Sequence, residues 1–147
     1  MKLFKLIYIV LVSGLFSACA SGPKYADVAS TFPTLEADKG RIYFYRSGSM
    51  MGAAIQPSIT LNGNIIGTSK PGGFFFVDAN PGDQVVATST EVEKKLTFLL
   101  DVGQVRYVKT KIGFGIIAGR VYPELVDNNI GEQEVKETSY IGAPLTD

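Results

Sequence analysis

The sequence predicts an all-β protein, with a single antiparallel β-sandwich of about seven strands at residues 40–147. Beyond Gly40, short runs of β-branched and aromatic residues are separated by Gly, Pro, Asn and Asp. These turn signals recur about every eight to twelve residues, and no convincing helical period occurs among them. Because 46% of the residues are hydrophobic and 19% are charged, the chain can bury one core. A parallel α/β arrangement is therefore disfavoured.

The first predicted strand, 41–46, alternates in character. Ile42 and Phe44 share one of its faces, and Tyr43 and Tyr45 share the other. Stacked tyrosines on a sheet face are used by carbohydrate-binding sandwiches, so a ligand surface at Tyr43 and Tyr45 is one hypothesis. The alternative is cross-strand packing beneath a loop or the C-terminal segment.

Two turn signals connect the next strands. A hairpin is predicted where 58–61 meets the Asn-Gly pair at 62–63, because both turn residues tolerate positive φ, and 65–66 returns from it. Residues 74–77 are apolar throughout, which is typical of a strand covered on both faces or of one whose outer side is a contact surface. At 80–83, proline fixes one φ and glycine accepts the next, which predicts a turn.

The remaining strands follow the same pattern. Residues 84–88 alternate weakly, 94–101 alternate well, and another strand is predicted at 105–112 after a glycine turn. One more strand is expected around 120–126. The acidic stretch 132–137 is expected to form a short helix or an edge strand that covers the sheet.

Residues 1–18 have the three parts of a secretory signal peptide. Met1 to Lys5 is basic, Leu6 to Phe16 is an apolar run, and the small residues Ser17 and Ala18 follow. A helix needs about twenty apolar residues to span a bilayer, so this run is too short for a permanent transmembrane segment. We expect the segment to be removed and exclude it from the fold.

The only cysteine, Cys19, ends a short motif, Leu-Phe-Ser-Ala-Cys at 15–19. This motif resembles the bacterial lipobox, although Phe16 stands where that pattern most often has leucine. The resemblance implies cleavage between Ala18 and Cys19, with the thiol alkylated by diacylglycerol and the new amino group acylated. Each buried methylene contributes about 0.8 kcal/mol to membrane binding, and two or more chains hold firmly. Membrane lipid, reached through acylated Cys19, is therefore a predicted partner.

The residue after the cysteine suggests a location. Ala20 is not aspartate, and by the sorting rule of lipoproteins this favours the outer membrane, with the domain facing the periplasm, over the inner membrane or the cell surface. The sequence Ala18-Cys19-Ala20 also satisfies the small-x-small rule of ordinary signal peptidase. Cleavage after Ala20 would release a soluble periplasmic protein, and this alternative stays open.

Residues 19–39 are mixed and aperiodic, with Pro23 and Pro33 among them. We expect them to form the lipidated N-terminus and a flexible tether, with a short helical turn near 25–30. The chain has 14 basic and 14 acidic residues, and removal of the signal peptide leaves a small acidic excess. Membrane attachment is therefore expected to depend on lipid rather than on charge.

Composition also excludes several classes of function. No basic stripe runs along the chain, so nucleic acid is not an expected partner. The chain has no histidine and no second cysteine, which removes the commonest general base, the commonest transition-metal ligand and any intramolecular disulfide. We expect no enzymatic activity, no catalytic residues, no cofactor and no bound metal.

Patterns that could carry chemistry have structural explanations. The segment 113–119 has the spacing GxGxxxG without a βαβ context, which favours a glycine-bent strand or a bulge, open to a partner or lipid contact, over a dinucleotide site. Adjacent Ser69 and Lys70 point to opposite faces of an extended chain and indicate a turn. Glu91 and Glu93 indicate a solvated edge rather than a hydrolase pair. Turn chemistry accounts for the aspartates at predicted strand ends, namely Asp78, Asp83 and Asp101.

Short motifs recur in a recognisable order from Gly40 to Tyr140. They are Gly40-Arg41-Ile42-Tyr43-Phe44-Tyr45-Arg46, Leu61-Asn62-Gly63 with Ile66-Gly67, Gly73-Phe74-Phe75-Phe76, Pro81-Gly82, and Gly103-Gln104 with Tyr107. Their succession resembles the lipoprotein family called domain of unknown function 2846. It is also similar to PEGA-like β-sandwich modules, of whose motif only the Pro-Gly turn is present. The resemblance implies an envelope-associated sandwich and brings no catalytic residues.

Together these features predict a lipid-anchored cell-envelope protein whose periplasmic sandwich is a non-catalytic interaction or structural module. Its further partner is expected to be an envelope protein or a glycan. A glycan- or peptidoglycan-binding module that uses Tyr43 and Tyr45 is the first alternative. A hydrolase with paired acidic groups in a cleft is the second.

Overall fold

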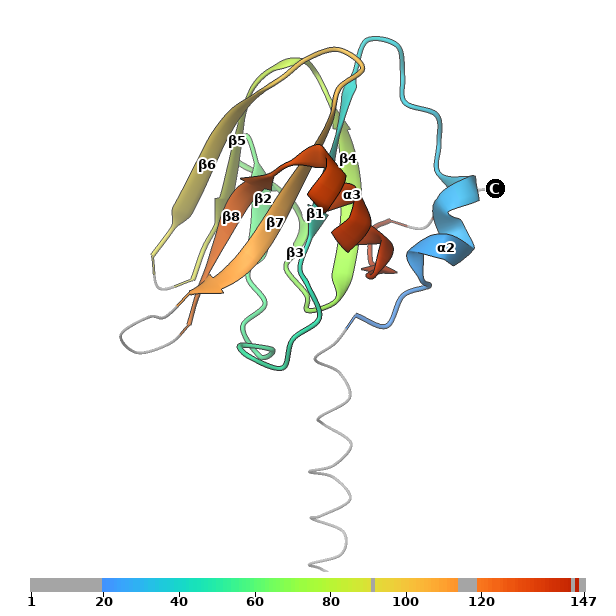
Figure 1. Cartoon of the computed structure of the whole chain (residues 1–147). Coiled ribbons are helices and arrows are strands. Elements are labelled where there is room, and N and C mark those ends of the chain that lie inside the picture. The colour runs from blue at the N-terminus through green and yellow to red at the C-terminus, as the bar shows by residue number, and fades with distance from the viewer. Residues whose placement is uncertain (1–19, 91, 114–118, 144, 146–147) are drawn as a thin grey trace, which may run out of the picture.

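A computed structural model describes residues 20–90, 92–113, 119–143 and 145 of the chain. Two sheets, of five and four strands, pack face to face, and short helices lie on one outer side (Figure 1). The predicted fold class, an all-β sandwich, is confirmed. Within the described residues, no helix is both long enough and apolar enough to cross a membrane.

The five-stranded sheet has the order β8-β7-β1-β4-β9. Its strands are β8 (Arg120–Val126), β7 (Val105–Gly113), β1 (Gly40–Tyr45), β4 (Gly73–Ala79) and β9 (Ser139–Tyr140). Contrary to the purely antiparallel prediction, β1 pairs with β7 in parallel, and so does β4 with β9. The chain reverses direction at each strand connection from β1 to β8, so β7 again runs the same way as β1. Local alternation carries no information about such distant pairing.

The four-stranded sheet has the order β3-β2-β5-β6 and is antiparallel throughout. Its strands are β2 (Ser58–Leu61), β3 (Asn64–Thr68), β5 (Gly82–Thr88) and β6 (Lys94–Leu100). The predicted hairpin is confirmed, because Asn62 and Gly63 join β2 to β3 with φ values of 50° and 86°.

Apolar side chains form two layers, one on each face of the five-stranded sheet. The inner layer, between the sheets, contains Ile42 and Phe44, and Phe44 stacks on Phe75 with ring centroids 5.2 Å apart. The outer layer is aromatic and includes Phe74, which is fully buried. Strand β4 therefore has apolar cover on both faces, as the run at 74–77 predicts.

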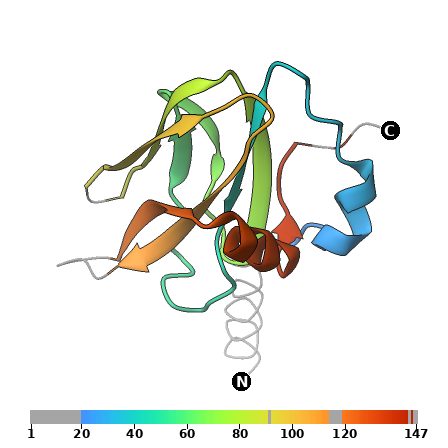
Figure 2. The ribbon, with the colours of Figure 1, turned by 45° about the horizontal axis from the view of Figure 1, so that its top comes forward.

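The outer layer is covered by the N-terminal segment and by the C-terminal helix (Figure 2). The N-terminal cover consists of α2 (Tyr25–Val28) and the 3-10 turn η2 (Ala29–Thr31), and this confirms the predicted helical turn. The flexible tether is corrected for its described part, since the Tyr25 amide bonds the Thr138 carbonyl at 3.2 Å and the Phe32 ring lies 5.0 Å from that of Phe76. Burial of these aromatic rings offsets the entropy of a free tether.

The C-terminal cover is α3 (Asn128–Lys136), so the acidic stretch forms a helix. The Asp127 side chain caps it by accepting a hydrogen bond from the Asn129 amide at 2.9 Å. Gly131 lets the helix approach the sheet closely, because a Cβ at this position would lie 2.4 Å from Cβ of Tyr107.

Candidate functional site

The predicted ligand surface, Tyr43 and Tyr45, is buried, with exposed fractions of 8% and 2%. Tyr43 stacks on Tyr107 with ring centroids 5.2 Å apart and planes inclined by 11°. The hydroxyl of Tyr45 points to Glu134 on α3. Of the two hypotheses for these tyrosines, the structure matches cross-strand packing under the C-terminal segment. Neither ring is open for stacking on a sugar.

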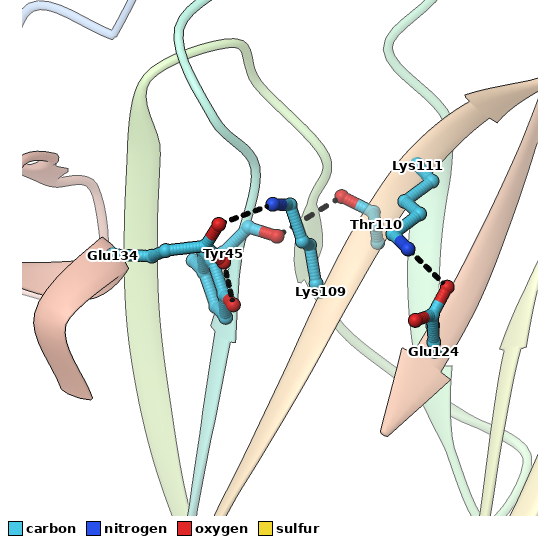
Figure 3. Close-up of polar contacts among 6 residues, drawn as sticks. All are labelled: Tyr45, Lys109, Thr110, Lys111, Glu124 and Glu134. Atoms are coloured by element: carbon cyan, nitrogen blue, oxygen red, sulfur yellow. Dashed lines mark hydrogen bonds and ion pairs between the residues drawn. The ribbon is translucent and has the colours of Figure 1, made fainter. Parts of the chain in front are cut away.

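A polar cluster joins α3 to the sheet beside these rings (Figure 3). Tyr45 donates to Oε2 of Glu134 at 2.5 Å, and Lys109 Nζ donates to Oε1 of the same carboxylate at 2.7 Å. Two residues further along β7, Lys111 forms an ion pair with Glu124 of β8 at 2.5 Å. Strand register explains the cluster, because Lys109 lies opposite Tyr45 on one side and Glu124 on the other.

The surroundings of Tyr45 and Glu134 fix the protonation state of each side chain. Burial, together with the hydrogen bond to Glu134, raises the pKa of Tyr45 far above its usual value. Burial opposes ionisation of Glu134, but the hydrogen bonds from Lys109 and Tyr45 outweigh it and lower the pKa of this carboxyl. Tyr45 is therefore a phenol that donates, and Glu134 is a carboxylate that accepts. This arrangement clamps α3 to the sheet.

We expect Glu134→Gln to destabilise the fold by about 1 kcal/mol at neutral pH, because charge-assisted hydrogen bonds become neutral ones at a partly exposed site. Since the folded pKa is lowered, the carboxylate's contribution is complete above the unfolded value of about 4.3 and is lost as pH falls through the folded pKa. Urea unfolding at several pH values measures this difference.

The matched control is Glu132→Gln on the same helix. Glu132 pairs with Lys136 at i,i+4, and both side chains are half exposed, so this change is expected to stay within about 0.5 kcal/mol. A stability gap between wild type and Glu134→Gln that keeps its size throughout the acid range would contradict the clamp.

Among the ion pairs of the described residues, the most buried joins Arg41 to Asp78, and the sequence did not predict it. Asp78, interpreted as a turn residue, accepts hydrogen bonds from Nε and Nη2 of Arg41 at 2.6 and 2.8 Å. The hydrogen bond to Asp78 raises the pKa of Arg41 against the effect of burial. The same guanidinium donates to the Pro33 carbonyl at 2.8 Å and lies 4.3 Å from the ring centre of Phe76. Arg41 and Asp78 have opposite charges and lie at two strand ends, which is the only sequence feature that could have suggested the pair. The β1–β4 register is what places them opposite each other.

Two open hollows lie near the end of β7. The first, of about 310 Å³, has Arg46, Lys109 and Lys111 in its lining. The second, of about 390 Å³, is lined in part by Lys94, Lys95 and Arg120. Over the described ranges, no group of three or more His, Cys, Asp or Glu side chains is placed to hold a metal ion.

Among the residues that it describes, the structure does not bring the other candidate catalytic residues together as a catalytic pair. Ser69 is buried, and its Oγ lies 2.8 Å from Oγ1 of Thr110 rather than against Lys70. Glu93 forms an exposed ion pair with Lys95 at 2.9 Å, in keeping with a solvated edge. Neither arrangement is that of a nucleophile and its base.

Some candidates lie outside the described residues. These are Ala18 and Cys19 at the predicted cleavage and lipid attachment site, Glu91, and residues 114–118 of the glycine-rich segment. The described ends of that segment are Gly113, which ends β7, and Gly119, just before β8.

Comparison with known families explains the order of the motifs. A family model described as "Protein of unknown function (DUF2846)" matches residues 36–121, more than half of the chain. The chain belongs to this family. None of the curated proteins compared with the chain matches it. In this DUF2846 member the match runs from before β1 to the beginning of β8, so both covers of the aromatic layer, α2 and α3, lie outside it.

Proposed function

We propose that this DUF2846 protein is a lipid-anchored, non-catalytic module of the bacterial cell envelope. Acylated Cys19 holds it in the outer membrane, and the sandwich lies in the periplasm as an interaction or structural unit. Its further partner is an envelope protein or a glycan that contacts the outside of the covered sandwich.

The observation that carries the proposal is that Ala20, the residue after the lipobox-like cysteine in the sequence, is bonded to the folded body. The Ala20 amide donates to the Pro71 carbonyl at 3.0 Å. Cys19 is thus followed at once by a residue bonded to the sandwich, and lipid on Cys19 would hold the fold directly. Release by cleavage after Ala20 would remove a residue that bonds to the body.

A non-catalytic role is supported by how the polar side chains are used. Beside the outer sheet face, Glu134 of α3 pairs with Lys109 of β7, and Glu124 of β8 pairs with Lys111 of β7. The acidic side chains described there do not form the carboxylate pair around a cleft that a glycosidase needs.

We expect Cys19→Ala to move the protein out of the membrane fraction or to leave its signal peptide uncleaved. Mass spectrometry of the wild-type N-terminus should find Cys19 as the first residue, carrying diacylglycerol and an amide-linked acyl chain. The matched control is Phe16→Leu, which brings the segment closer to the lipobox and should leave lipidation intact.

Two results would contradict the proposal. A mature wild-type chain that begins at Ser21 would identify the soluble periplasmic alternative. Undiminished membrane retention of a Cys19→Ala protein whose signal peptide has been removed would show that some other feature attaches the protein.

A further inference from the structure

One end of the sandwich lies where the described chain begins. Strand directions bring the ends of β1, β3 and β7 and the starts of β4, β6 and β8 to this end (Figure 1). Ala20 is bonded to Pro71 in the β3–β4 turn, and the Gly72 amide of that turn bonds the Arg46 carbonyl at 2.9 Å. The β1–β2 loop, residues 46–57, is thus joined to the entry point of the chain. We call this region the anchor end.

The β1–β2 loop exposes two adjacent methionines at the anchor end. Met50 is 72% exposed and Met51 is 64% exposed. The loop behind them is held, because buried Arg46 donates to the carbonyls of Gly52 and Ile55 at 2.8 and 2.7 Å. A braced loop that presents neighbouring apolar side chains is typical of an interaction surface, and methionine adapts to irregular apolar surroundings.

Charge is divided between the two ends of the sandwich. Lysines at the anchor end include Lys70, Lys94, Lys95 and Lys111, and the buried Arg46 adds a further positive charge. Acidic residues there include Glu93 and Glu124, which are paired with Lys95 and Lys111. The opposite end carries Glu36, Asp38, Asp78, Asp83, Asp101 and Asp127, together with Lys39, Arg41 and Arg106. The anchor end is therefore positive and the far end negative, although the chain as a whole is neutral.

We propose that the anchor end docks on an anionic phospholipid surface, with Met50 and Met51 inserted among the lipids and the lysines of this end near the headgroups. This inference rests on the proposed function for one element, the lipid on Cys19. Consecutive Cα atoms lie about 3.8 Å apart. A lipid attached to Cys19 would therefore bring the membrane surface close to Ala20. Lipid is favoured over a protein partner because the surface lies directly beside the attachment point, and because its positive charge suits anionic headgroups.

If the anchor end docks, charge contributes to membrane attachment as well as lipid. The expectation that charge has no part followed from the net charge of the mature sequence, in which the positive end and the negative end cancel. Attraction to an anionic surface acts over roughly a Debye length, about 8–10 Å, so the nearer end dominates. The acylated protein would then stand with its negative end away from the membrane.

The chain contains no tryptophan, so a single introduced one reports its own surroundings. We expect Met51→Trp, as full-length lipidated protein on phosphatidylethanolamine and phosphatidylglycerol vesicles, to show a blue-shifted emission. It should be quenched by brominated lipid and shielded several-fold from acrylamide. The matched control is Val102→Trp. Val102 is 58% exposed in the turn at the far end, so a tryptophan there should remain open to acrylamide.

A second variant tests the methionines themselves. Ala54 is exposed and lies in the same turn as Met51. Vesicles should shield the tryptophan of Ala54→Trp from acrylamide, and the added changes Met50→Asp and Met51→Asp should abolish this shielding. These surface changes are expected to leave stability within about 0.5 kcal/mol. Shielding that survives both aspartates would overturn the role of the methionines.

The remaining outcomes separate the two proposals. Lipidated protein that floats with the vesicles while Met51→Trp stays as open to acrylamide as Val102→Trp would overturn docking and leave lipid anchoring intact. Equal quenching of both tryptophans by brominated lipid would also overturn it, since the molecule would then have no preferred end. A mature wild-type protein that carries no acyl chain and does not float with the vesicles would overturn both proposals.

Discussion

Phe74→Ala is expected to lower the free energy of unfolding by about 3–5 kcal/mol. Phe74 is 0% exposed, and its ring centre lies 5.5 Å from that of Tyr25 and 5.4 Å from that of Tyr140. Removal of the ring leaves a cavity beneath the N-terminal segment. The backbone around it is held by hydrogen bonds, including that from the Tyr140 amide to the Pro23 carbonyl at 2.8 Å, so the cavity cannot close fully.

Urea unfolding measures the loss, and hydrogen exchange locates it. The Tyr25 and Tyr140 amides, which join the N-terminal segment to the C-terminal one, should lose protection more than amides of β5 and β6. Ile65→Ala, at a side chain 73% exposed, is the surface control and should change stability by no more than about 0.5 kcal/mol. A loss of less than about 1 kcal/mol for Phe74→Ala would show that the N-terminal segment does not pack as described.

Asp78→Ala is expected to destabilise the fold by about 3 kcal/mol, because it leaves a buried guanidinium without its ion partner. The side chains of Arg41 and Asp78 are 8% and 23% exposed. The partial exposure of Asp78 places the expected loss at the lower end of the range for broken buried pairs. Thermal or urea unfolding measures it.

A second substitution tests whether the unpaired charge is the cause. Adding Arg41→Met to Asp78→Ala removes the stranded cation and leaves an apolar side chain beside Phe76, so much of the stability should return. Asp83→Ala, at an exposed position, is the matched control and should have little effect. A double variant as unstable as Asp78→Ala alone would rule out the unpaired charge as the cause.

The covered aromatic layer changes how the strand tyrosines are understood. Tyr43 and Tyr45 have the alternation that the sequence predicts, and both lie on the face opposite Ile42 and Phe44. In a two-layer sandwich that face would be open to solvent. Here α2, η2 and α3 close it, so the surface left for partners lies on the outside of these covers and at the two ends of the sandwich.

Features governed by neighbouring residues could be predicted from the sequence. The Asn62-Gly63 turn followed from the φ values that these residues tolerate, and the double cover of β4 followed from an uninterrupted apolar run. The helical turn near residue 25 and the cover formed by 132–137 were also expected. Each depends on side-chain period or turn chemistry, which are local properties.

Contacts between distant segments needed the tertiary structure. The parallel pairing of β1 with β7, the Arg41 to Asp78 ion pair and the Glu134 clamp join residues far apart in the chain. No local period encodes these partners, because they arise from the order in which strands enter two sheets.

By itself, then, the sequence determined an all-β fold, its strand faces and a cysteine suited to lipid attachment. Only the tertiary structure decided that the segment expected to be a tether packs against the core and that a neutral chain has one basic and one acidic end. The physical reason is that burial and electrostatic potential depend on which segments meet in space, whereas periodicity and turn preference depend only on adjacent residues.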